Sequence, residues 1–132
     1  MAGRAVRGLI AGVSLAVALG AAADAPSQRT VNDAVFTKDQ AREGKRLYRQ
    51  HCQMCHDRRY FEPVLRSWDG RTLGMLFETM SSTMPQTNPG MLPRENYVDI
   101  LAYILEENDY PDGESELDYR GGELDGIVIA QP

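Results

Sequence analysis

The segment HCQMCHDRR, residues 51–59, contains both cysteines and both histidines of the chain. Cys52 and Cys55 are separated by two residues, and His56 follows the second cysteine directly. Two thiols at this spacing can form a redox disulfide, supply half of a zinc site or attach a prosthetic group covalently. The rest of the sequence discriminates among these uses and indicates the fold in which they would occur.

The first 23 residues have the pattern of a secretory signal peptide. Arg4 and Arg7 precede an apolar run over residues 9–19, and small residues follow it. This run is shorter than the ~20 apolar residues that a transmembrane helix needs. We therefore predict a signal peptide over 1–23, cleaved after Ala23, with a retained membrane anchor as the alternative. The mature chain is expected to be periplasmic and to have no membrane span.

Charge is unevenly divided along the chain of 132 residues. Residues 24–71 contain ten Lys and Arg against seven Asp and Glu, whereas residues 72–132 contain two against twelve. Because the chain is acidic, we expect no binding to nucleic acid. The separation of charge favours electrostatically oriented encounters with a protein partner. The alternative is that the acidic C-terminal part is solvated and only aids solubility.

Hydrophobic periodicity predicts an all-α domain with large loops. Thr37, with Gln40 three residues later, has the spacing of a capping box and begins a helix that runs from about residue 38 to the cysteines. Amphipathic patterns predict two more helices, and segments rich in Pro and Gly are expected to be loops. The helices are residues 71–82 and 94–108, and the loops are 57–70 and 83–93.

The remaining organisation follows from composition. Residues 24–36 are small and polar and are expected to form a linker after the signal peptide. Residues 37–112 contain the predicted helices and form the domain. Residues 113–132 are rich in Gly and acidic side chains, and we predict a tail there.

Covalent haem attachment fits this all-α chain better than the other uses of the two cysteines. Zinc needs further ligands, and the two histidines lie too close to the cysteines to form a separate second pair. A thioredoxin-type pair is expected between a strand and a helix, and an inert local disulfide is a further alternative. Cys-x-x-Cys-His is the attachment signature of c-type haem. We predict one haem c, bonded to Cys52 and Cys55, with His56 as the proximal iron ligand.

Over roughly residues 37–112, the sequence resembles class I monohaem cytochromes c, and it is similar to the small c-type domains associated with periplasmic quinoprotein and other dehydrogenases. Gly44 and Tyr48 lie eight and four residues before the first cysteine, where the family has a glycine and an aromatic residue. In the family, the first and last helices cross at these positions, and Ile100 and Tyr103 would be the counterparts here. The resemblance implies a cytochrome c fold of three to four helices with large loops around one covalently bound haem.

The resemblance also implies further haem contacts. A Met-Pro dipeptide follows a short helix, which implies Met84 as the distal ligand, with Met91 of the same loop as the alternative. Ligation by a thioether favours ferrous iron and raises the reduction potential. Pro63, in Pro-Val-Leu, matches the family residue whose carbonyl accepts a hydrogen bond from the proximal histidine. Trp68 occupies the place of a tryptophan beside a haem propionate.

We expect an electron-transfer protein and not an enzyme, because two filled axial positions leave no site for a substrate. The expected function is transfer of single electrons between redox proteins, such as a periplasmic dehydrogenase and a terminal oxidase or another cytochrome. One alternative is a permanently bound haem subunit of a dehydrogenase or oxidase complex, with residues 116–132 as a docking arm. Another is an enzyme or gas sensor in which Met84 is absent from the iron or displaceable.

Overall fold

The computed structural model describes residues 1, 3 and 27–132. The elements are α1 (Lys38–His51), α2 (Phe61–Ser67), α3 (Leu73–Thr83), α4 (Arg94–Glu107) and a short 3₁₀ segment, η1 (Arg120–Gly126). The described residues form isolated β-bridges and no strand. This confirms the prediction of an all-α fold. The predicted signal peptide, apart from residues 1 and 3, lies outside the described residues.

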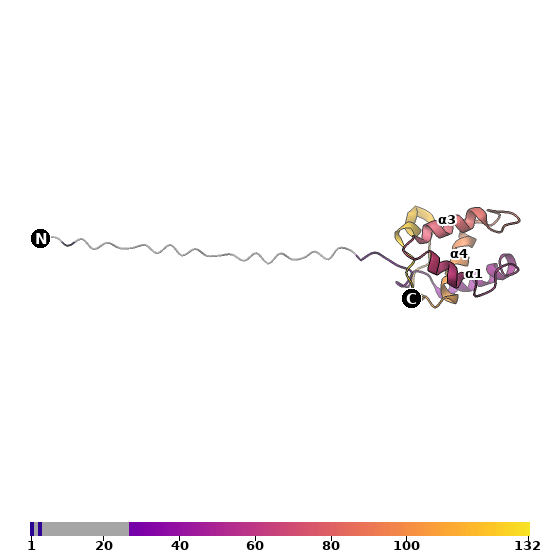
Figure 1. Ribbon diagram of the computed structural model, residues 1–132, viewed down its shortest axis with the longest axis horizontal. Coiled ribbons are helices and arrows are strands. Elements are labelled where there is room, and N and C mark those ends of the chain that lie inside the picture. Colours follow the sequence, from indigo (N-terminus) through magenta and orange to yellow (C-terminus); the bar gives the residue numbers. More distant parts are fainter. Residues whose placement is uncertain (2, 4–26) are drawn as a thin grey trace.

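Two helices, α1 and α4, form the largest helix–helix interface of the domain, and α3 packs against α4 and η1. Figure 1 shows α4 between α1 and α3, and α4 packs against both of these helices. The loops that follow α1 and α3 lie at the same end of the molecule. Within the described part of the chain, no helix has the length and apolar character needed to cross a membrane.

The beginning of α1 agrees only partly with the predicted capping box. The Thr37 hydroxyl accepts a hydrogen bond from the Gln40 N–H at 3.1 Å, as expected of an N-cap. The Gln40 side chain forms a different contact from the one the capping box predicts. Its amide donates to the Leu117 carbonyl at 3.0 Å and accepts from the Leu117 N–H at 2.9 Å. Gln40 therefore connects α1 to the C-terminal segment.

The α1–α4 interface depends on a glycine. A methyl group built on Gly44 would overlap the carbonyl oxygen of Asp99 in α4 and lie 3.0 Å from the Ile100 nitrogen. The two helix backbones are therefore in contact, which confirms the role predicted for Gly44. One turn further on, the rings of Tyr48 and Tyr103 lie 5.2 Å apart.

The second helix, α2, lies where we predicted a loop. The loop prediction for residues 57–70 is wrong over Phe61–Ser67. Pro63 occupies the third position of this helix, where its missing N–H removes no intrahelical hydrogen bond. A proline in the first turn is thus compatible with a helix.

The predicted linker and tail are parts of the domain, which corrects the boundaries drawn from the sequence. Seven apolar side chains of the two segments are buried: Val31, Val35, Phe36, Leu117, Leu124, Ile127 and Ile129. Val128 forms bridges with Thr30 and with Thr72, so the two segments and the start of α3 are joined through their backbones. Because the apolar side chains of residues 116–132 lie in the chain's own core, this segment does not form a free docking arm.

We predict that Gly44→Ala lowers the free energy of unfolding by about 1–3 kcal/mol, because the added methyl group separates α1 from α4. On helix propensity alone, alanine would stabilise this position by ~1 kcal/mol, so the sign of the change is decisive. The matched control is Gly126→Ala, where a methyl group would meet no heavy atom within 4 Å. Urea unfolding measures both, and a Gly44→Ala variant as stable as wild type would contradict the predicted contact.

Candidate functional site

The Cys-x-x-Cys-His segment forms a compact turn that continues α1. The Cys52 N–H donates to the Tyr48 carbonyl at 2.8 Å. The N–H groups of Cys55 and His56 both donate to the Cys52 carbonyl, at 3.1 and 3.0 Å. Both thiols are free, and Cys55 is exposed whereas Cys52 is half-buried. One short turn therefore holds two thiols and an imidazole.

The environment of Cys52 disfavours a redox role for the pair. Burial raises the pKa of the Cys52 thiol to about 11, so this thiol is protonated near neutral pH. Redox-active cysteines have a lowered pKa because the thiolate is the reacting species. The described residues also contain no cluster of three or more His, Cys, Asp or Glu side chains that could hold a metal ion.

The imidazole of His56 lies among aromatic rings and has an unpaired nitrogen. Its ring is 4.0 Å from the ring of Tyr60 and 6.0 Å from that of Phe61. Nδ1 is buried and makes no hydrogen bond to any described residue. An unsatisfied buried polar atom costs about 1–3 kcal/mol. Two free thiols and an imidazole within one short turn fit a covalently attached metal porphyrin.

Tyr48 fixes the backbone at His56. Its hydroxyl donates to the His56 carbonyl at 2.8 Å and lies 3.2 Å from the Asp57 carbonyl. Burial raises the pKa of Tyr48, so the hydroxyl stays protonated and able to donate. The end of the Cys-x-x-Cys-His turn is thus held against α1 by Tyr48, which precedes His56 by eight residues.

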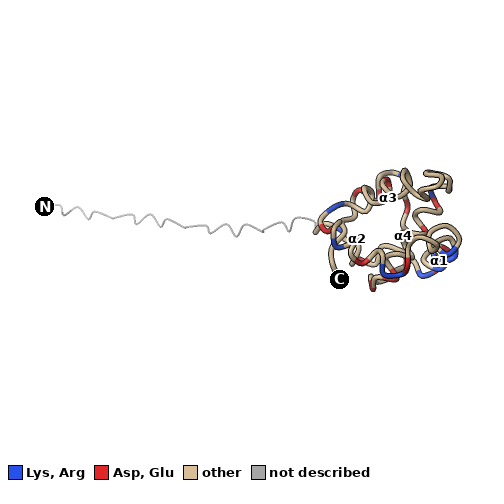
Figure 2. Tube along the Cα trace, turned by 45° about the vertical axis from the view of Figure 1, so that its right-hand side comes forward, with Lys and Arg blue, Asp and Glu red and all other residues tan. Residues whose placement is uncertain are grey.

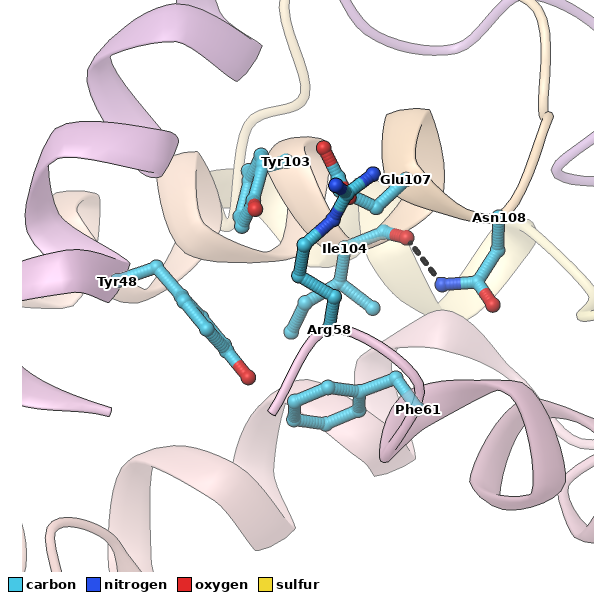
Figure 3. A pocket seen from close by; sticks show the side chains of 7 residues that line it. All are labelled: Tyr48, Arg58, Phe61, Tyr103, Ile104, Glu107 and Asn108. Carbon is cyan, nitrogen blue, oxygen red and sulfur yellow. Dashed lines mark hydrogen bonds and ion pairs between the residues drawn. The ribbon is translucent and has the colours of Figure 1, made fainter. Parts of the chain in front are cut away.

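An ion pair anchors the same loop to α4. Arg58 Nε lies 2.6 Å from a carboxylate oxygen of Glu107, whose side chain is 14% exposed. Lys45 of α1 lies 3.9 Å from the other oxygen of that carboxylate. Figure 3 shows Arg58 reaching toward Glu107, with Tyr48, Phe61 and Tyr103 around the same small cavity. The loop after His56 is therefore tied to both helices of the α1–α4 pair.

Met84 directly follows the last residue of α3 and is the C-cap of that helix. Its N–H donates to the Met80 carbonyl at 2.9 Å, and its carbonyl accepts a hydrogen bond from the Tyr97 hydroxyl at 2.6 Å. Met84 is partly buried, whereas Met91 is 48% exposed. Which of the two sulfur atoms binds iron stays a prediction.

The other two predicted haem contacts lie on α2 and at its end. Pro63 lies in the first turn of α2, and carbonyls in a helix point along the axis toward later residues. The predicted hydrogen bond between His56 and Pro63 is accordingly not formed in this structure. Trp68 follows the last residue of α2, and the Arg71 guanidinium lies 5.2 Å from the centre of its ring. Its contact with a propionate stays a prediction.

Two contacts that matter at the site were not predicted from the sequence. Tyr97 lies in the helix predicted over residues 94–108, but the amphipathic pattern does not show that its hydroxyl donates to the Met84 carbonyl. The Arg58–Glu107 pair joins residues 49 positions apart, a separation at which charge pattern alone gives no signal.

Comparison with protein families places the chain among c-type cytochromes. Residues 39–104 match the family described as "Cytochrome C oxidase, cbb3-type, subunit III". This match covers half of the chain, so the chain belongs to this family, which has a class I monohaem cytochrome c-like domain. The family is one of haem-binding electron-transfer domains, and it implies haem c as the cofactor. Domains of this kind are typically extracytoplasmic.

Comparisons with curated proteins and with solved structures gave no match.

We predict that replacing both cysteines, Cys52→Ser with Cys55→Ser, leaves a chain with little helix in circular dichroism. Haem attached there would fill the centre of the domain, where α2 has no extensive contact with another helix. A variant that lacks haem and keeps the helicity of wild type would contradict this expectation.

Proposed function

We propose that the chain is a periplasmic monohaem c-type cytochrome that carries single electrons between redox proteins. The observation that carries this proposal is the turn at the end of α1, which brings two free thiols and the His56 imidazole together in one short segment. The family match supports haem-based electron transfer. The proposed route to the periplasm is the signal peptide predicted over residues 1–23.

Four residues would hold the cofactor. Cys52 and Cys55 would bind it through two thioethers, with His56 and Met84 as the axial ligands of the iron. When bound, haem c supplies an iron that gains and loses one electron. The chain's own residues keep the ligands in place: Tyr48 and the Arg58–Glu107 pair fix the backbone after His56.

We propose that redox partners contact the Cys-x-x-Cys-His turn at Cys55, which is exposed. Figure 2 shows Lys and Arg along α1, which carries Lys38, Arg42, Lys45, Arg46 and Arg49. Most acidic residues follow residue 71 in the sequence. This separation of charge would orient a partner before contact, and electron-transfer rates would then depend on ionic strength. Redox interfaces are small, ~1,200 Å² or below, which permits rapid exchange of partners.

A second candidate function is that of a permanent haem subunit in an oxidase or dehydrogenase complex. The family description names a subunit of cytochrome c oxidase, and this wording favours the candidate. The C-terminal segment does not add support, because Ile127 and Ile129 are fully buried in the domain itself.

The assignment of the distal ligand predicts a difference between Met84→Ala and Met91→Ala. Sulfur-to-iron charge transfer gives an absorption band in the oxidised protein only when a methionine is bound. We expect this band to vanish in Met84→Ala and to persist in Met91→Ala, because Met91 is half exposed whereas Met84 is partly buried. The reverse result would assign the iron to Met91.

The choice between carrier and subunit predicts different behaviour in native extracts. A carrier elutes from gel filtration at the size of the free domain, since its contacts with partners are weak. A subunit elutes together with the activity of its enzyme. We expect elution as the free domain, and quantitative co-elution with an oxidase or dehydrogenase would establish the second candidate instead.

A further inference from the structure

The loop between α3 and α4, residues 84–92, is closed by hydrogen bonds that meet at Met84. The Met84 carbonyl accepts from the Tyr97 hydroxyl at 2.6 Å and from the Gly90 N–H at 3.2 Å. Gly90 has a φ of +74°, a conformation that suits glycine and lets the chain turn back toward Met84. A single carbonyl therefore joins the two ends of the loop.

The Tyr97 hydroxyl is the centre of this arrangement. Besides donating to Met84, its oxygen lies 3.5 Å from the Leu92 N–H at the far end of the loop. A phenol can donate one hydrogen bond and accept others, so both contacts form at once. Tyr97 lies in the first turn of α4 and is only 2% exposed, so water does not readily replace it.

We propose that Tyr97 is a positioning residue that keeps the Met84 sulfur on the iron. This inference rests on the proposed ligation by His56 and Met84. The loop has few other backbone hydrogen bonds. In one of them, the Asn88 N–H donates to the Pro85 carbonyl at 2.9 Å. Without the hydroxyl, the Met84 carbonyl keeps only the bond from the Gly90 N–H, and the Leu92 N–H loses its partner. The loop then opens more often, and a competing ligand reaches the iron more readily.

Tyr48 supplies a matched comparison on the other side of the proposed iron. It is also 2% exposed, and its hydroxyl also binds backbone carbonyls, those of His56 and Asp57. Replacing either tyrosine with phenylalanine removes one hydroxyl and keeps the ring. Tyr48→Phe therefore releases the backbone at His56, whereas Tyr97→Phe releases the backbone at Met84.

The experiment titrates the oxidised, haem-loaded full chain with imidazole, which competes with a methionine for iron. The intensity of the sulfur-to-iron band reports how much Met84 remains bound. We expect Tyr97→Phe to bind imidazole about tenfold more tightly than wild type, the effect of losing one net hydrogen bond. Tyr48→Phe should stay within about twofold of wild type, since it leaves the Met84 loop intact.

Four outcomes would each overturn one of two claims, the ligation by Met84 or the role of Tyr97. A wild-type protein without the band, or a Met84→Ala variant that keeps it, would refute the proposed ligation itself. With the band present, equal imidazole affinity in Tyr97→Phe and wild type would refute the role of Tyr97. An equal gain in both tyrosine variants would refute it too, because it would indicate general loosening.

A measurement on wild type covers the case in which Tyr97→Phe fails to fold. Imidazole binding should accelerate hydrogen exchange of the Gly90 and Leu92 amides, because displacing Met84 releases the loop they close. The amides of Cys55 and His56, which bind the Cys52 carbonyl, should exchange as before. Unchanged exchange at Gly90 and Leu92 in the imidazole complex would contradict the proposal.

Discussion

The backbone contact between α1 and α4 at Gly44 is the constraint on which the rest of the structure depends. Because no side chain separates the two helices there, the end of α1 lies at a fixed place beside α4. The Cys-x-x-Cys-His turn continues α1 directly and takes its position from that helix. The adjacent helix α4 carries Tyr97 and Glu107, which bind the Met84 loop and the loop after His56. One helix pair thus positions both proposed ligands.

The chain holds the two ligand segments by different means. On the histidine side, a helix end, a tyrosine hydroxyl and an ion pair act together on residues that two thioethers would also hold. The Arg58–Glu107 pair is exposed on the arginine side, so it serves placement more than stability. On the methionine side, no covalent bond is available, and the loop is closed by hydrogen bonds to one carbonyl. The methionine is therefore the ligand expected to leave first.

The sequence predicts what is local in this fold. Helix periodicity locates α1, α3 and α4 closely, the N-cap Thr37 marks the start of α1, and the glycine within α1 indicates the helix crossing. The failures involve long-range contacts or ambiguous local signals. Residues 113–132 look like a tail because Gly and acidic residues dominate, yet the contact between Gln40 and Leu117 spans 77 positions. Pro63 is an equally good signal for a loop and for the first turn of a helix, and the direction of the Tyr97 hydroxyl has no sequence signal.

The central claim is that haem is bonded covalently to Cys52 and Cys55. The most direct test is the mass of the intact chain, purified from cells able to attach haem c and measured under denaturing conditions. The wild-type chain should be heavier than its polypeptide by the mass of one haem. The variant in which both cysteines are replaced should have the mass of its polypeptide alone. A wild-type chain with the mass of the polypeptide alone would contradict this claim.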